Sequence, residues 1–351
     1  MTRTERAPRR RALVTGLAGF TGRYVAQALE AAGYEVWGTV APGSPAGDSR
    51  LDAGPSTGPD AGPDIAPNAA LDPSRDPELA RYPMLPADLR DAESVRAAVA
   101  DARADAIVHL AACSHVTEND PSELYLVNVV GTRHLLAALD TLEIRPRCVL
   151  LASSANVYGN ASASTLDEQV APCPANDYAL SKLSMEYTAR LWASRLPIVI
   201  ARPFNYTGVG QRESFLLPKL VAHFASEAPR IALGNLDVRR DFSDVRDVAA
   251  AYARLVELAP AGRTFNVCSE RTYSLKEVLA MLSRMAGYVI DVSIDPRFVR
   301  SSEVKTLNGS RAALRACIGE LPLTPLDATL RWMMAAARAG ARTATPATER
   351  G

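Results

Sequence analysis

This 351-residue chain has no formal net charge, few lysines and no long apolar run, and these features exclude whole classes of protein. Basic and acidic residues both number 39, so the formal net charge is zero. A protein that coats nucleic acid or an anionic membrane surface needs surplus positive charge, so we expect neither partner. The chain also lacks a run of about 18 apolar residues, which predicts that no segment spans a membrane.

Cysteine is sparse and scattered. The five thiols include no pair at CxxC spacing; they are Cys113, Cys148, Cys173, Cys268 and Cys317. An odd, unclustered set is typical of a reducing compartment and supports neither a disulfide framework nor a zinc site. The basic first segment is followed by only three apolar residues before Thr15, too few for the core of a signal peptide. We therefore expect a cytoplasmic protein without a structural metal.

Only four of the 39 basic residues are lysines, namely Lys182, Lys219, Lys276 and Lys305. The arginine codons of a GC-rich genome account for most of this bias. Where arginine is the default, however, a lysine can mark a position that needs a compact ammonium group rather than a planar guanidinium.

Short apolar segments alternate with helical ones through the first two-thirds of the chain. The apolar segments have the character of strands buried on both faces and cover residues 12–15, 35–40, 106–110, 148–152 and 198–202. Helical spacing separates them, at residues 22–32, 92–102, 122–142 and 178–194. This alternation predicts an α/β fold of the Rossmann type, in which helices cover both faces of a doubly wound parallel sheet.

The rest of the chain predicts a smaller, mixed α/β C-terminal domain interleaved with the first. We expect the first domain over residues 12–202 and about 236–268, and the second over residues 203–235 and 269–334. Residues 41–77 hold eight of the 24 prolines and five of the 21 glycines, which predicts a flexible surface insertion. Residues 1–11 and 335–351 are expected to be flexible ends.

A glycine triplet lies where the first expected strand meets the first helix. The segment reads Gly16-Leu17-Ala18-Gly19-Phe20-Thr21-Gly22. These glycines let the backbone turn tightly, approach a pyrophosphate and pack the helix against the sheet. The helix N-terminus adds free N–H donors and the positive end of its dipole. In this strand–turn–helix context the triplet predicts a dinucleotide site rather than a merely structural turn.

The second expected strand ends in Thr39, Val40 and Ala41, without an acid. A carboxylate there would hold the 2′-hydroxyl of the adenosine ribose and select NAD(H), so its lack favours NADP(H) while leaving NAD(H) open. Asp88 follows the third strand. It is expected to contact the adenine, to cap the helix that begins near residue 92, or to do both.

Tyr178 and Lys182 are spaced i and i+4 in an expected helix, so their side chains share one face. A free phenol has a pKa of about 10, and a nearby ammonium stabilises the phenolate and lowers that pKa. Ser154 follows the fifth strand, at the edge where doubly wound sheets place their ligands. Alone, a Tyr-xxx-Lys pair is usually a surface pair. Together with the glycine loop and the serine, it predicts a proton-transfer unit.

These motifs, in their order and spacing, resemble those of the extended short-chain dehydrogenases/reductases that act on nucleotide sugars. The resemblance spans about residues 11–332 and also rests on His109-Leu110-Ala111-Ala112 and Arg202-Pro203-Phe204-Asn205. The second half is most similar to the GDP-mannose 4,6-dehydratase branch and its reductases that form GDP-rhamnose. The residues that carry this similarity include Leu233-Gly234-Asn235-Leu236 and Arg240-Asp241-Phe242-Ser243-Asp244.

The resemblance implies roles for individual residues. Ser154, Tyr178 and Lys182 match the catalytic set, with Tyr178 as general acid and Lys182 also on the nicotinamide ribose. Positions implied to bind the cofactor are Gly16, Gly19, Phe20, Thr21, Asp88, Leu89, Leu110, Ala111 and Ala112. Positions implied to bind the sugar nucleotide, with GDP favoured, are Ser114, His115, Asn156, Asn205, Lys219, Asn235, Arg240, Arg300 and Glu303. For Arg240 and Arg300 the alternative role is a salt bridge, and for His115 a structural hydrogen bond. The resemblance also implies a homodimer.

The reaction itself stays open among several alternatives. The resembling dehydratases use a glutamate three residues before Gly159 to remove a sugar proton, and that position here is Asn156, which disfavours 4,6-dehydration. The remaining groups suffice for hydride transfer with one proton transfer, as in the reduction of GDP-4-keto-6-deoxy-mannose. A 4-epimerase with tightly bound NAD and a dehydratase without the usual base are the alternatives. A non-catalytic nucleotide sensor is disfavoured because both Tyr178 and Lys182 are present.

Overall fold

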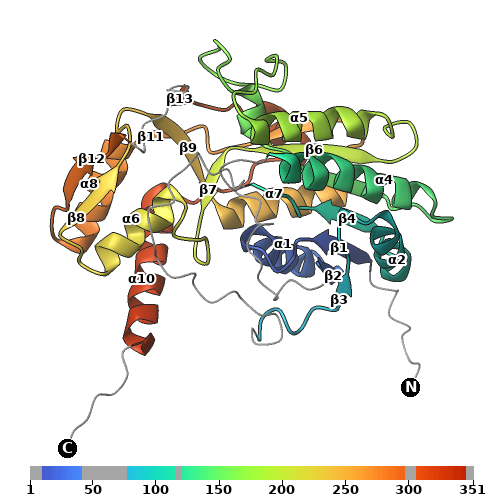
Figure 1. The fold of residues 1–351 in the computed structure, drawn as a ribbon, viewed down its shortest axis with the longest axis horizontal. Helices are drawn as coiled ribbons and strands as arrows, with labels where there is room; N and C mark the ends of the chain where they lie inside the picture. The colour runs from blue at the N-terminus through green and yellow to red at the C-terminus, as the bar shows by residue number, and fades with distance from the viewer. Residues whose placement is uncertain (1–9, 42–76, 115–120, 297–305, 345–351) are drawn as a thin grey trace, which may run out of the picture.

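A seven-stranded parallel sheet forms the centre of the protein (Figure 1). The computed structural model describes residues 10–41, 77–114, 121–296 and 306–344, with the side chains of 341–344 left out. The strand order is β10-β6-β5-β4-β1-β2-β3. The strands are β1 (Arg11–Thr15), β2 (Glu35–Val40), β3 (Met84–Pro86), β4 (Ala106–His109), β5 (Cys148–Ala152), β6 (Ile198–Pro203) and β10 (Thr264–Val267). The predicted doubly wound Rossmann-type sheet is confirmed.

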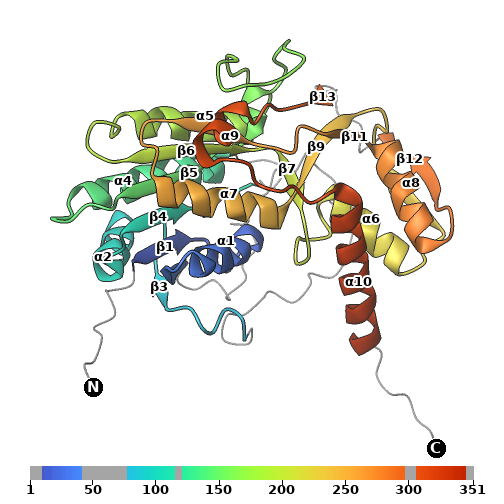
Figure 2. The ribbon, with the colours of Figure 1, turned by 180° about the vertical axis from the view of Figure 1, so that it is seen from behind.

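The strands are mostly apolar because helices cover both faces of the sheet (Figures 1 and 2). Along β1, Ala12 and Val14 point into one core and Leu13 into the other. The first core is closed by α1 (Phe20–Ala31), α7 (Val245–Leu258) and α9 (Ala312–Ile318). The second is closed by α2 (Ala92–Ala102), α4 (Thr132–Asp140) and α5 (Asp177–Arg190).

The C-terminal part has a hydrophobic core of its own. This core gathers apolar side chains of β8 (Arg230–Leu233), β12 (Asp291–Ile294), α6 (Leu216–Ala225), α8 (Leu275–Ala286) and α10 (Leu326–Ala344). A four-stranded sheet adjoins it, made of β7 (Asn205–Thr207), β9 (Arg239–Asp244), β11 (Thr272–Ser274) and β13 (Thr306–Leu307). The chain leaves this sheet through β9 and returns to the large sheet in α7 and β10, so the two parts are interleaved.

Two helical segments differ from the sequence prediction. The single helix expected over residues 122–142 is divided into α3 (Ser122–Tyr125), a π-helical turn η2 (Leu126–Gly131) and α4. The flexible end expected from Ala335 is wrong for its first ten residues, because α10 continues to Ala344. That stretch is rich in alanine, the residue with the highest helix propensity.

Other predictions fall partly or wholly outside the described residues. These are the insertion at 41–77, apart from its two end residues, and the flexible N-terminus before residue 10. All five cysteines are free thiols. In the described part of the chain, the helices are too short or too polar to cross a membrane.

Candidate active site

The glycine loop joins β1 to α1 at the carboxyl edge of the sheet. Gly16 has a φ of +71°, and a Cβ there would lie 2.9 Å from the backbone nitrogen of Ala111. A Cβ on Gly22 would lie 2.3 Å from the carbonyl oxygen of Gly16. Both positions therefore exclude a side chain. The helix starts after Gly19, with neither a side-chain cap nor an acid in its first turn. The N–H groups of this first turn point toward the carboxyl edge of the sheet and fit the pyrophosphate of a dinucleotide.

Tyr206 of β7 covers the first turn of α1. Its hydroxyl lies 2.8 Å from Thr21 Oγ1, and its ring stacks on Phe20 with centroids 6.1 Å apart. The segment that follows β6 is thereby joined to the predicted cofactor loop. Tyr206 is not among the residues predicted from the sequence, although it directly follows Asn205 in the same motif.

Ser154 and Tyr178 lie together at the carboxyl ends of the central strands. Ser154 begins a short 3-10 helix, η3 (Ala155–Tyr158), and its Oγ accepts a hydrogen bond from the Asn156 amide at 3.1 Å. Asn176 caps α5 by accepting from Ala179 N at 2.8 Å, which starts the helix just before Tyr178. Ser154 and Tyr178 line one small hollow, together with Thr21, Leu110, Ala152, Ser153, Pro203, Tyr206 and Tyr252. The glycine loop, Ser154 and Tyr178 therefore face the same hollow.

Burial has the largest effect on the pKa values of Tyr178 and Lys182. It raises the pKa of Tyr178 to about 12, against a hydrogen bond with Ser154 that lowers it. The expectation of a pKa below 10 is therefore wrong, because removing the phenol from water outweighs the effects that stabilise the phenolate. Lys182 is 2% exposed and its Nζ donates to the Ala152 carbonyl at 2.9 Å. Burial lowers the pKa of Lys182 to about 8. At neutral pH the phenol stays protonated, as a general acid requires.

A buried chain of hydrogen bonds starts at the residue before the glycine loop. Thr15 Oγ1 lies 2.7 Å from His109 Nδ1, and His109 Nε2 lies 3.0 Å from Thr132 Oγ1. The Thr132 hydroxyl donates its own proton to the Asn128 carbonyl at 2.7 Å. His109 Nε2 must therefore carry the proton toward Thr132, and Nδ1 accepts from Thr15. Burial lowers the pKa of His109 to about 3, aided by the charge of Lys182, so the ring is neutral.

Asn128 continues this chain from the π-helical turn to the helix that carries Tyr178. Its side chain accepts from Cys113 N at 2.8 Å and donates to Cys113 O at 2.9 Å. The same amide nitrogen donates to Ser181 Oγ at 2.9 Å, and Ser181 donates to the Tyr178 carbonyl at 2.8 Å. Asn128 is not among the residues predicted from the sequence, because a polar residue in a helical pattern does not indicate that the helix widens there.

The remaining predicted cofactor residues line the carboxyl edge of the sheet. Leu110 borders the hollow, Ala111 adjoins Gly16, and Ala112 is fully buried. Leu89 packs against Gly131 of the π-helical turn.

Asp88 forms an ion pair with Arg90 at 2.8 Å, and this hydrogen-bonded partner lowers the pKa of Asp88. Its expected role as the cap of α2 is wrong. Asp91 is the cap and accepts from Glu93 N at 3.0 Å. Because Asp88 lies three residues further from the start of α2, it instead closes the preceding turn onto Arg90.

The predicted substrate residues are spread over both parts of the protein. Asn205 is buried on β7, and its Oδ1 has no hydrogen-bond partner within the described part of the chain, so it suits a donor group of a ligand. Asn156 directly follows the Ser154 turn. Arg240 is buried on β9 and donates to the Arg239 carbonyl at 3.0 Å.

Lys219 and Asn235 belong to the smaller part. Lys219 on α6 reaches the Ala232 carbonyl at 3.4 Å, and Asn235 accepts from Asp237 N at 3.0 Å in the turn between β8 and β9. Ser114 is half-buried just beyond β4. His115, Arg300 and Glu303 lie outside the described residues.

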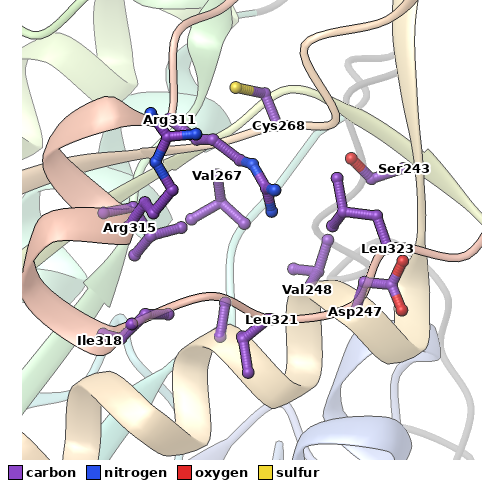
Figure 3. Close-up of a pocket in the computed structure, with 13 residues that line it drawn as sticks. Ser243, Asp247, Val248, Val267, Cys268, Arg311, Arg315, Ile318, Leu321 and Leu323 are labelled. Carbon is purple, nitrogen blue, oxygen red and sulfur yellow. The ribbon is translucent and has the colours of Figure 1, made fainter.

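A second hollow lies between α7, β10 and α9, away from these groups. Figure 3 shows Arg311 and Arg315 on one side of it and Ser243 and Asp247 on the other. Arg311 is already paired with Glu270 and Glu320. The walls of this second hollow contain none of the predicted catalytic or cofactor residues, whereas Ser154 and Tyr178 line the hollow described above.

The sequence model of the NAD dependent epimerase/dehydratase family matches residues 12–268. The chain belongs to this family. The match covers the glycine loop as well as Ser154, Tyr178 and Lys182. The chain is therefore an NAD(P)-dependent enzyme of the extended short-chain dehydrogenase/reductase type.

Two relatives within the epimerase/dehydratase family are each 34% identical to this chain. One is the GDP-6-deoxy-D-talose 4-dehydrogenase of Aggregatibacter actinomycetemcomitans, similar over 66% of this chain and 79% of its own length. The other is the GDP-6-deoxy-D-mannose reductase of Pseudomonas aeruginosa, similar over 65% and 78%.

Two solved structures share the fold of this epimerase/dehydratase chain. A protein of Burkholderia cenocepacia J2315 with a provisional epimerase assignment is 66% identical, with a TM-score of 0.82 over 95% of this chain and 99% of that one. RMD from Pseudomonas aeruginosa, complexed with NADPH, is 29% identical, with a TM-score of 0.74 over 94% and 99%.

Proposed function

We propose that this enzyme is a cytoplasmic, homodimeric reductase that uses NADP(H) to reduce the C4 ketone of GDP-4-keto-6-deoxy-mannose. The observation that carries the proposal is the shared hollow. It is lined by Thr21 of the glycine loop and by Ser154 and Tyr178, so a cofactor and a ketone can meet beside one proton donor.

The groups of the chain have separate tasks in this reaction. The nicotinamide, when bound, supplies the hydride for C4 of the sugar. Ser154 donates a hydrogen bond that holds the ketone oxygen. Tyr178, protonated because burial raises its pKa, gives its proton to that oxygen as negative charge develops there. The Lys182 ammonium then stabilises the phenolate that remains.

Elimination of water has less support than reduction. Dehydration needs a base beside Ser154, and that place is taken by Asn156, whose amide cannot serve as one. The two acids that follow in the chain have structural partners. Asp167 accepts from Gln169 N at 2.9 Å, and Glu168 accepts from Asn266 N at 2.7 Å.

The preference for NADP(H) is supported by the end of β2, where Thr39 and Val40 offer no carboxylate to a ribose 2′-hydroxyl. The complex of RMD with NADPH points in the same direction. We expect kcat/KM for NADPH to exceed that for NADH by roughly tenfold or more. Equal values for the two cofactors would refute the preference.

The substrate class is supported by the names of both relatives, which concern GDP-linked 6-deoxyhexoses. Talose and mannose differ at C4, so the product reports the face that receives the hydride. The test is incubation with GDP-4-keto-6-deoxy-mannose and NADPH, followed at 340 nm, with the C4 configuration read by NMR. If no cofactor is oxidised and denaturation releases bound NAD, the enzyme is instead an epimerase.

Replacing the general acid tests the catalytic assignment. We expect Tyr178→Phe to lower kcat by roughly 100- to 10,000-fold while NADPH still binds. Tyr288→Phe is the matched control, because Tyr288 lies beside α8 and its hydroxyl donates only to backbone carbonyls. Undiminished turnover by Tyr178→Phe would overturn the assignment.

The homodimer is supported by apolar side chains on the outer surface of α5. Leu180, Tyr187 and Leu191 are 44%, 55% and 70% exposed and share one face of the helix. Leu126 and Val130 of the π-helical turn, which packs on α5, are also exposed. A patch of this kind suits a self-complementary interface between two copies.

A further inference from the structure

Glu186 is a buried carboxylate, one turn beyond Lys182 on α5, that the proposed reaction does not use. It is fully buried and accepts three hydrogen bonds, one from Ser153 just beyond β5 and two from Arg202 of β6. Ser153 Oγ donates at 2.5 Å, and Arg202 donates through Nε at 2.8 Å and Nη2 at 2.6 Å. Arg202 is only 3% exposed, so the whole ion pair is withdrawn from water.

Both donors belong to segments that carry reacting groups. Ser153 stands between Ala152, whose carbonyl accepts from Lys182, and Ser154. Arg202 begins the run that leads to Asn205. One carboxylate therefore joins α5 to the ends of both β5 and β6.

The arginine extends the network beneath the serine turn. Its Nη1 donates to the hydroxyl of Tyr158 at 2.9 Å, and that hydroxyl donates to Asn266 Oδ1 at 2.8 Å. Tyr158 ends the 3-10 helix that starts after Ser154. The position of Ser154 is thus held from both sides of its turn.

An ion pair so deeply buried is a weak source of stability, because withdrawing both charges from water offsets much of their attraction. The ion pair lies next to Ser154 and Lys182, so we expect it to serve the site and not only the stability of the fold. We propose that Glu186 is a positioning residue that keeps Lys182 in its ammonium form and in register with Ser154. This role rests on the proposed function, because it serves the proton transfer described there.

The charges around Lys182 agree with this role. Burial lowers the pKa of Lys182, while Cys113 and Glu186 raise it. An amide in place of the carboxylate would remove one of these opposing groups and leave the Arg202 guanidinium without its anion. Among the described residues, the charge of Lys182 interacts with Cys113, Glu186 and His109. Tyr178 lies one turn before Lys182 on α5, and Arg202 lies behind Glu186 as its ion-pair partner.

The role can be tested without any substrate. The chain has four lysines, so carbon-13-labelled lysine gives four side-chain signals, and Lys182→Arg identifies the one from Lys182. We expect that signal to titrate at about pH 8 in the parent protein. In Glu186→Gln the midpoint should fall by roughly one pH unit or more.

Asp244→Asn provides the matched control. Asp244 is also fully buried and paired with an arginine, Arg246 at 2.6 Å, yet it is not among the groups that shift Lys182. In Asp244→Asn the titration midpoint of Lys182 should equal that in the parent protein. An identical Lys182 midpoint in folded Glu186→Gln would overturn the proposal.

Activity measurements distinguish the effect of Glu186 on the charge of Lys182 from its effect on the position of Ser154. In the parent enzyme the alkaline limb of kcat should follow Lys182, and in Glu186→Gln it should move to lower pH with the lysine signal. Ser153→Ala removes one donor and leaves no charge unpaired, which makes it informative even if Glu186→Gln does not fold. We expect Ser153→Ala to keep the lysine midpoint and to lower kcat roughly three- to tenfold.

Unchanged kcat in Ser153→Ala would refute the positioning role. Failure of the parent enzyme to oxidise NADPH with the GDP sugar would count against the proposed function instead. The lysine titration remains decisive for Glu186 in that event, because it measures the charge of Lys182 directly.

Discussion

His109 offers a quantitative test of how burial controls charge next to the cofactor loop. The ring is 3% exposed, donates from Nε2 to Thr132 and accepts from Thr15 at Nδ1. Burial lowers its pKa from 6.5 to about 3. Protonation would force Nδ1 to become a donor against the Thr15 hydroxyl and would place a cation near Lys182. We expect His109→Gln to remove this penalty together with the titrating group.

The direction of the effect follows from proton linkage. The folded-state pKa is depressed, so the stability that depends on neutral His109 is complete above pH 6.5 and is lost as the pH falls toward 3. Between pH 7 and pH 5 the unfolded chain gains about 0.7 proton at this residue, while the folded chain gains almost none. This difference lowers the free energy of unfolding by about 2 kcal/mol, and only in the protein that has the histidine.

Urea unfolding at pH 7 and pH 5 measures the effect. The parent protein should lose about 2 kcal/mol more than His109→Gln between these two conditions, since the remaining histidines contribute equally to both. At pH 7 the variant should itself be less stable by about 1–3 kcal/mol, because a buried hydrogen bond is lost. Nitrogen-15 NMR should show the neutral Nε2–H tautomer from pH 5 to pH 8. Equal losses in both proteins, or a titrating His109 signal, would refute the reasoning.

Three further substitutions test the loop, the buried ion pair and the surface of α5. Gly22→Ala places a Cβ 2.3 Å from a backbone oxygen, so NADPH binding measured by fluorescence should weaken roughly tenfold or more; unaltered affinity would contradict the geometry. Arg202→Met leaves Glu186 buried without its cation and should lower the free energy of unfolding by about 3–5 kcal/mol in urea. A loss below about 1 kcal/mol would show that the pair is not withdrawn from water. Leu191→Glu should convert dimers to monomers in sedimentation velocity, whereas Val289→Glu, at another exposed apolar position, should not.

Much of the architecture follows from local sequence patterns. The apolar segments at residues 12–15, 35–40, 106–110 and 148–152 become neighbouring strands, because short apolar runs separated by helices favour a parallel sheet. The prediction failed at two helices. The high helix propensity of the alanine-rich end continued α10 to Ala344, whereas the helix over residues 122–142 widened into a π turn around Asn128, which local preference does not indicate.

In the candidate site, too, local patterns predicted some features and not others. Spacing alone predicted that Tyr178 and Lys182 share a helix face and that the glycine loop precedes a helix. It could not predict that Asp88 would turn toward Arg90, or that Tyr206 would cover the loop from a distant strand. Such contacts depend on how separate segments pack, which periodicity does not encode.

The sequence by itself determined the strand–helix alternation and the glycine loop, because these depend on neighbours a few positions away, and it predicted Tyr178 and Lys182 as the proton-transfer residues. Only the tertiary structure decided their chemical states. Burial by remote elements keeps Tyr178 protonated, holds His109 neutral and lowers the pKa of Lys182 to about 8. It also pairs Glu186 with Arg202 beneath the site. The physical reason is that the free energy of a charge depends on the water and the charges around it, and these are set by folding.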